Sequence, residues 1–213
     1  TDRGDFKTPG IIYAAGAHPR LAGFEGESEF RGHGVAYCAT CDGMFYRNKQ
    51  VFVIGGGNSA AEEALFLAKL ASKVTMVVRK DHLRAQASVA KQVAESDKVD
   101  IRYLTSVVRV EGDGLLESIT FRNNETGEET TETYDKGSFG VFVFAGRVPA
   151  TGLLEGLAEL DGHGYVVTNE RMETSTPGLF AAGDVAVVKN TLARLLEMRT
   201  VMRYKETKES LPE

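Results

Sequence analysis

The chain has 213 residues, a formal net charge of −5 and a pI near 5.5. Hydrophobic residues make up 42% of it, charged residues 26%, and it has 23 glycines, as expected for a soluble globular protein with many tight turns. The acidic balance and the lack of a basic stripe argue against nucleic-acid binding. No apolar stretch approaches the roughly 20 residues that a membrane span needs. We therefore expect a globular protein that binds neither nucleic acid nor membrane.

The chain has only two cysteines, and they lie three residues apart. Two cysteines are too few for the disulfide framework of a small secreted domain. The first residues, beginning at Thr1, also lack the apolar core and the cleavage site of a signal peptide. These features favour a cytoplasmic setting.

The hydrophobic pattern predicts a βαβ unit in the first half of the chain. A short buried strand at 10–16 is followed by a polar connecting loop at 23–34. A strand at 50–54, a helix at 58–70 and a second strand at 73–78 then form the unit.

The second half is expected to contain an antiparallel meander. After a helix at 86–95, strands are predicted at 99–105, 107–111, 115–122 and 129–135, with a hairpin turn at 123–128. Further strands are predicted at 139–145, 164–167 and 179–182, and the chain from Thr191 onward looks helical.

A glycine-rich loop follows the strand at 50–54. Gly55, Gly57 and Ala60 form a GxGxxA pattern between a strand and a helix. The glycines would let the backbone turn sharply and approach a pyrophosphate, and the small third residue would permit close helix packing. The pattern indicates dinucleotide binding over the alternative of a merely structural glycine turn.

Basic residues stand where the next strand ends. Arg79 and Lys80, with Arg84 nearby, occupy the region in which an acidic residue would hold the ribose 2′-hydroxyl of NAD. They favour the 2′-phosphate of NADP(H). Because Asp81 follows them, the alternative is a solvated charged turn.

The cysteines form a CxxC motif, Cys38-Ala39-Thr40-Cys41, followed by Asp42. This spacing lets two thiols close a small disulfide ring reversibly, and the adjacent acid is suited to proton transfer. A structural zinc site would need four ligands, and the chain has no second CxxC or paired histidines. Zinc binding and two inert buried cysteines remain as alternatives to redox chemistry.

A last motif is the apolar run at 176–184, which ends in Gly183-Asp184. Taken alone, it could be any strand-to-helix connection with Asp184 as the N-cap.

The order of these elements resembles the low-molecular-weight thioredoxin reductases, flavoproteins with separate FAD and NADPH domains. The resemblance covers about residues 10–184, and its most specific part is the run GVAYCATCDGMFYRNK at 34–49, which leads directly into the glycine loop. It implies that NADPH reduces FAD, that the flavin reduces a Cys38–Cys41 disulfide, and that the dithiol reduces thioredoxin. Cys41 would face the flavin, Cys38 would attack the partner disulfide, and Asp42 would be the acid/base.

The resemblance also implies the residues that contact the cofactors. Nucleotide contacts on the nicotinamide side would come from Gly55, Gly57, Asn58, Ser59 and Ala60. Contacts to the 2′-phosphate would come from Arg79, Lys80 and Arg84. Asp184 would lie on the FAD side, with Gly16 and Gly146 as close-backbone positions at the two domain crossings.

We therefore expect an α/β fold with a Rossmann-like NADPH-binding domain, including an antiparallel meander, at 20–147. Residues 1–19 and 148–213 would be fragments of a second Rossmann-like domain that binds FAD. In the family a GxGxxG loop for FAD lies upstream of the cysteines, and this chain lacks it, so FAD binding should be weak or absent. A homodimer is one candidate oligomeric state.

Two other functions are weighed against this one. The flavoprotein component of alkyl hydroperoxide reductase shares the layout but generally favours NADH, against which Arg79 and Lys80 argue. A non-catalytic NADP(H)-binding fragment would keep the cysteines without electron flow, and the absent FAD loop supports it.

Overall fold

The computed structural model describes residues 3–188. The chain forms two compact units, one made of Pro19–Gly146 and the other of the segments before and after it. Each unit has its own apolar core. No helix within the described range is long and apolar enough to cross a membrane.

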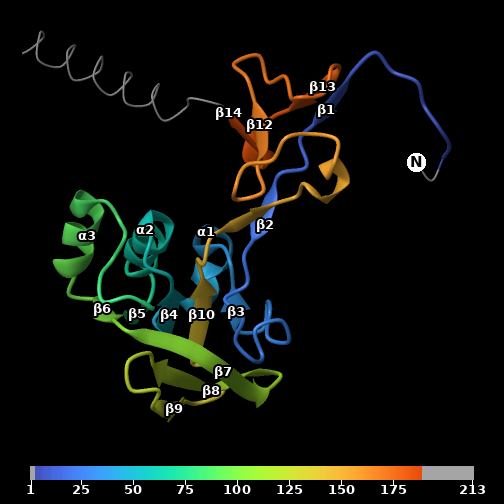
Figure 1. The fold of residues 1–213 in the computed structure, drawn as a ribbon. Helices are drawn as coiled ribbons and strands as arrows, with labels where there is room; N and C mark the ends of the chain where they lie inside the picture. The colour runs from blue at the N-terminus through green and yellow to red at the C-terminus, as the bar shows by residue number, and fades with distance from the viewer. Residues whose placement is uncertain (1–2, 189–213) are drawn as a thin grey trace, which may run out of the picture. The chain divides into compact units, whose positions relative to one another are not determined.

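The Pro19–Gly146 unit is built on a five-stranded parallel sheet in the order β3-β10-β4-β5-β6 (Figure 1). Its strands are β3 (Val35–Ala36), β4 (Gln50–Ile54), β5 (Lys73–Val77), β6 (Val99–Arg102) and β10 (Phe139–Val143). The central strands are continuous apolar runs because both faces of the sheet are covered.

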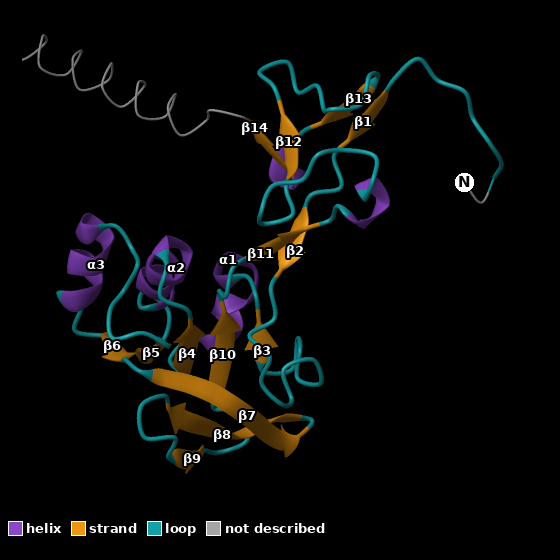
Figure 2. Ribbon diagram, in the orientation of Figure 1, coloured by secondary structure: helices purple, strands orange, loops and turns teal. Residues whose placement is uncertain are grey.

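Helices cover one face of this sheet and a meander covers the other (Figure 2). The helical elements are α1 (Ala39–Asp42), the 3-10 helix η1 (Gly43–Tyr46), α2 (Asn58–Leu67) and α3 (Ala87–Ala94). The meander consists of β7 (Thr105–Asp113), β8 (Leu115–Asn123) and β9 (Glu129–Thr133), paired antiparallel. Strand β4 serves both cores because successive side chains point to opposite faces: Val51 and Val53 pack with the helices, and Phe52 packs with the meander.

The second unit has a smaller core that includes Leu154, Val166 and Leu179. Its elements are β1 (Ile11–Tyr13), the 3-10 helix η2 (Gly152–Leu154), β12 (Val166–Thr168), β13 (Leu179–Ala181), the 3-10 helix η3 (Gly183–Val185) and β14 (Ala186–Val188). β1 pairs with β13 and β12 with β14, both in parallel. A further two-stranded sheet joins β2 (Ala17–Pro19) to β11 (Arg147–Pro149).

The predicted fold class is confirmed, and so are the βαβ unit and the meander. The sequence pattern missed β2, β3, α1, β11 and β14, since elements of two to four residues carry too little periodicity to be recognised. The N-cap interpretation of Asp184 is wrong: η3 has Ala182 as its N-cap, and the chain continues as β14. The helix predicted from Thr191 lies outside the described residues.

Candidate nucleotide and disulfide site

Most predicted site residues of the Pro19–Gly146 unit follow the carboxyl ends of its parallel strands. β3 leads into Cys38, β4 into Gly55, β5 into Arg79 and β10 into Gly146. Because the strands run parallel, these ends meet at one edge of the sheet. The sheet order reverses between β4 and β10, and ligands of open α/β sheets bind at such a switch point. The fold therefore brings the cysteine motif and the glycine loop to the same edge.

Position 55 requires glycine because of both its backbone conformation and its close neighbours. Its φ of 144° lies where side chains other than glycine are strained. A Cβ built on Gly55 would lie 2.6 Å from the carbonyl oxygen of Phe144 and 2.8 Å from the Cβ of Ala60. The first and last small residues of the motif thus let α2 pack closely against the strand ends.

Gly57 has a different environment at the N-cap of α2. A Cβ placed there would meet no atom within 4 Å, and the residue offers no side chain to cap the helix. The first N–H groups of a helix have no acceptor within it, so those of Asn58, Ser59 and Ala60 need an outside partner. An open, uncapped helix end suits the pyrophosphate of a dinucleotide.

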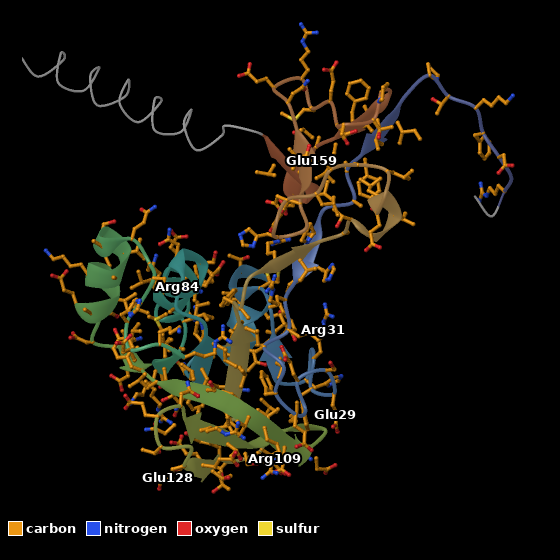
Figure 3. All side chains as sticks on the ribbon, viewed as in Figure 1. Glu29, Arg31, Arg84, Arg109, Glu128 and Glu159 are labelled. Atoms are coloured by element: carbon orange, nitrogen blue, oxygen red, sulfur yellow. A yellow bond between two sulfur atoms is a disulfide. The ribbon has the colours of Figure 1, made fainter. Side chains whose placement is uncertain are left out.

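The segment after β5 is tied to the glycine loop by two backbone donors. The N–H of Arg84 donates to the carbonyl oxygen of Gly56 at 2.7 Å, and the N–H of Gln86 donates to Asn58 Oδ1 at 2.6 Å. Figure 3 labels Arg84 in this region. The side chain of Asn58 therefore orders the loop, a role that its position in the motif did not indicate.

This segment carries Arg79, Lys80 and Arg84, which we call the basic rim. All three are exposed, and none forms an ion pair with another residue in the described range 3–188. The neighbouring carboxylate of Asp81 is held instead by His82, 2.6 Å from Nδ1, and this hydrogen bond lowers the pKa of Asp81. The rim thus offers three cations to an anionic ligand beside the glycine loop.

Cys38 and Cys41 form a disulfide at the start of α1. Cys38 is half-buried, whereas Cys41 is exposed. The interpretation as two buried, inert thiols is therefore wrong. Within residues 3–188, no group of three or more His, Cys, Asp or Glu side chains is arranged to hold a metal ion.

Asp42 lies on the same short helix as the cysteines. Its N–H donates to the carbonyl oxygen of Cys38 at 3.1 Å, and its side chain is half-buried. With Tyr46 and Lys49, among others, Asp42 lines a cavity of about 180 Å³. Burial, and secondarily the charge of Asp42, raises the pKa of Tyr46. Asp42 thus adjoins Cys41 in the chain and lines a partly apolar cavity whose lining includes neither cysteine.

The sequence did not single out Glu27, a buried carboxylate that holds the segment before the cysteines in place through hydrogen bonds. Glu27 is only 2% exposed and accepts hydrogen bonds from the N–H groups of Ala22 and Gly23 and from the Tyr37 hydroxyl, at 2.9, 2.6 and 2.8 Å. Burial, together with this bond to Glu27, raises the pKa of Tyr37 well above its usual range. Tyr37 immediately precedes Cys38, so these hydrogen bonds fix the backbone that enters the redox motif.

Gly16, Gly146 and Asp184 have more open surroundings. The φ values of Gly16 and Gly146 are 73° and 112°, but a Cβ at either would meet no atom within 4 Å. Their backbone conformation, rather than a close contact, therefore requires glycine. Asp184 is exposed and lies 3.3 Å from Arg147 Nη2, which also donates to the carbonyl oxygen of Ala17. The sequence did not single out Arg147 because this pairing spans a long stretch of chain.

The fold and site define a class: a Rossmann-like α/β protein with a CxxC disulfide at the same sheet edge as a glycine-rich loop. The family model described as pyridine nucleotide-disulphide oxidoreductase matches residues 2–206. The chain belongs to this family.

Several relatives of this chain are thioredoxin reductases. The chain is 46% identical over 187 residues to a thioredoxin reductase of Peptoclostridium litorale, a match that covers 87% of this chain and 59% of the relative. A thioredoxin reductase of Treponema pallidum is 45% identical over 185 residues, with the same coverage of each chain. The structure of the Lactococcus lactis thioredoxin reductase superposes with a TM-score of 0.76 at 37% identity, covering 85% of this chain and 59% of that one. The chain therefore spans about 60% of the length of these relatives.

Proposed function

We propose that this chain is the NADPH-binding, disulfide-bearing part of a thioredoxin reductase. The observation that carries the proposal is the placement of the Cys38–Cys41 disulfide and the Gly55 loop at one edge of a single sheet. In this proposal residues 20–147 form the NADPH-binding domain. Residues 1–19 and 148–213 belong to an FAD-binding domain. The division of the chain into two compact units supports this arrangement.

The residues present fit NADPH. The open N-cap at Gly57 would receive the pyrophosphate, with the first-turn amides of α2 as donors. The basic rim would hold the 2′-phosphate, because an exposed guanidinium or ammonium without a protein partner is free to bind an anion. When bound, NADPH and FAD supply the electrons that reduce the disulfide.

The proposed exchange with thioredoxin uses both cysteines and consumes no further reductant. The thiolate of Cys38 attacks a sulfur of the thioredoxin disulfide, so that a mixed disulfide forms and the second thioredoxin sulfur leaves as a thiolate. Cys41 then attacks Sγ of Cys38, which restores the Cys38–Cys41 disulfide and releases the dithiol. Asp42, on the same helix, would hold or deliver a proton during these steps.

The surface next to the motif favours the disulfide of a protein, rather than that of a small molecule, as the substrate. Met44 and Phe45 follow Asp42 after a single glycine, Gly43, and are 58% and 73% exposed. Adjacent exposed apolar side chains of this size are typical of a protein-binding surface. We therefore propose thioredoxin, or a protein with the same fold, as the partner.

A single-turnover experiment tests this function without requiring FAD. The chain is reduced with dithiothreitol, desalted and mixed with oxidised thioredoxin. About one thioredoxin disulfide should be reduced per chain, with re-formation of the Cys38–Cys41 disulfide, as measured by thiol labelling and mass spectrometry. The Cys41→Ser variant should stop at the mixed disulfide, and Cys38→Ser should transfer nothing. If the reduced chain leaves thioredoxin oxidised, the non-catalytic NADP(H)-binding alternative gains support.

The proposal assigns FAD to the complete protein, with at most weak binding to this chain. Gly16 and Asp184 would contribute to the flavin site, and the carboxylate of Asp184 is here paired with Arg147. Chain mixed with excess FAD is expected to lose the flavin on gel filtration. Absorbance of the protein peak in the visible flavin bands measures this, and a stoichiometric yellow complex would contradict the expectation.

A further inference from the structure

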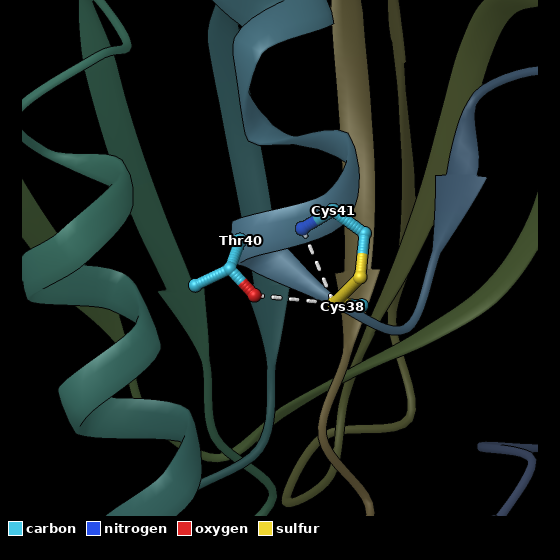
Figure 4. Close-up of a disulfide and its surroundings, with 3 residues drawn as sticks. All are labelled: Cys38, Thr40 and Cys41. Atoms are coloured by element: carbon cyan, nitrogen blue, oxygen red, sulfur yellow. Dashed lines mark hydrogen bonds between the residues drawn. A yellow bond between two sulfur atoms is a disulfide. The ribbon is translucent and has the colours of Figure 1, made fainter.

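The two sulfurs of the disulfide have different hydrogen-bond environments (Figure 4). Cys38 Sγ lies 3.2 Å from the backbone nitrogen of Cys41, which donates to it, and 3.4 Å from Thr40 Oγ1. The Cys38 side chain thereby caps α1. Two donors thus converge on one sulfur of the pair.

The direction of the contact with Thr40 follows from the chemistry of the disulfide. A sulfur in a disulfide carries no proton, so the Thr40 hydroxyl must be the donor. The same hydroxyl can keep donating after reduction, when the acceptor becomes a thiolate. A hydrogen bond to an ionised acceptor is stronger than one to a neutral acceptor, so the contact should stabilise the reduced, anionic state more than the disulfide.

We propose that Thr40 is a catalytic residue whose hydroxyl stabilises the thiolate of Cys38, making Cys38 the nucleophile of the pair. When a dithiol such as dithiothreitol reduces the pair, it closes to its own disulfide, the Cys38–Cys41 S–S bond breaks, and both sulfurs become thiolates or, after protonation, thiols. The negative charge is held preferentially on Cys38, where the Thr40 hydroxyl and the Cys41 N–H both donate. This role rests on the proposed disulfide exchange, but the stabilisation itself can be measured without any partner.

Other titratable groups lie on α1 itself, on the segments next to it and on the helix packed against it, and they must stay unchanged in the test. They are Asp42 on α1, Tyr46 on η1, Tyr37, Glu27 and Arg31 on the preceding segment, and Glu62 and Glu63 on α2, which packs against α1. Thr40→Val replaces the hydroxyl by a methyl group of similar size and leaves all of these in place. Thr40 is exposed, so the substitution opens no cavity.

The experiment measures the thiolate of Cys38 in the Cys41→Ser background, which leaves a single thiol. The rate of alkylation by iodoacetamide, in which the thiolate displaces iodide, is followed from pH 5 to pH 10. Thr40→Val should raise the pH midpoint by about half a unit to one unit, which reduces the thiolate roughly threefold to tenfold below the midpoint. Thr40→Ser, which keeps the hydroxyl, should retain the original midpoint.

A second readout uses the intact pair. At a fixed ratio of reduced to oxidised dithiothreitol near neutral pH, a smaller fraction of the Cys38–Cys41 pair should be reduced in Thr40→Val than in the wild type, because the dithiol state has lost its stabilising donor. Equal alkylation midpoints for Cys41→Ser alone and for Cys41→Ser combined with Thr40→Val or Thr40→Ser, with unchanged far-UV circular dichroism, would overturn the proposal. Failure of thioredoxin reduction with an intact midpoint shift would instead refute the proposed partner and leave the role of Thr40 in place.

Discussion

Replacing Arg79 and Lys80 together by alanine is expected to weaken NADPH binding about 100-fold, or about 2.7 kcal/mol, while changing NADH binding less than about twofold. The two cofactors differ only in the 2′-phosphate, and the side chains of the basic rim form no ion pair within residues 3–188. Arg84 stays unchanged in this variant, so the measured effect belongs to the two adjacent residues Arg79 and Lys80. Calorimetric titration of each variant with NADPH and NADH at two salt concentrations measures the effect.

The matched control is the Arg47→Ala/Lys69→Ala variant. It removes the same two types of charge from exposed positions that precede β4 and β5, away from the carboxyl ends of those strands. Its NADPH affinity should equal that of the wild type. Equal loss of NADPH and NADH affinity in the rim variant would show that the rim does not bind the 2′-phosphate. A wild-type chain that prefers NADH would favour the alkyl hydroperoxide reductase alternative.

A second large effect is expected from Gly55→Ala, which should lower the free energy of unfolding by about 3 kcal/mol or more. Its Cβ would have to fit between the Phe144 carbonyl and Ala60, at 2.6 and 2.8 Å, in a backbone conformation that alanine rarely adopts. Urea unfolding followed by far-UV circular dichroism measures the loss, since the chain has no tryptophan to serve as a fluorescent probe.

Gly57→Ala is the matched comparison within the same loop. Its Cβ would meet no protein atom within 4 Å, and the φ of Gly57 is −92°, which any residue can adopt. This variant should unfold within about 1 kcal/mol of the wild type and still lose affinity for both NADPH and NADH, because the methyl group occupies the space proposed for the pyrophosphate. Wild-type nucleotide affinity in Gly57→Ala would place the pyrophosphate elsewhere, and wild-type stability in Gly55→Ala would contradict the packing argument.

The sequence was informative where a property is local. The strand at Gln50–Ile54 is apolar from Val51 onward and leads into three glycines, and each of these features can be recognised within a few neighbouring residues. The meander could be predicted because its strands are consecutive and joined by short turns. The CxxC spacing likewise indicates a disulfide without knowledge of the fold, since the two residues lie within one turn.

The sequence did not reveal contacts between segments far apart in the chain. β3 has only two residues, and its place in the sheet comes from pairing with β10, roughly one hundred residues later in the chain. The ion pair of Asp184 with Arg147 likewise links remote side chains whose types are common on any surface. No local pattern distinguishes such residues from solvated ones.

The sequence by itself determined the α/β class, the glycine loop, the basic rim and the cysteine pair, because glycine conformations, apolar runs and short-range spacing are local properties of the chain. Only the tertiary structure decided that the cysteines share a sheet edge with the glycine loop, and that two donors converge on Cys38 rather than on Cys41. Both depend on how the backbone is placed in three dimensions. The sheet order follows from the pairing of remote strands, and the hydrogen bonds to Cys38 follow from the way α1 begins after β3.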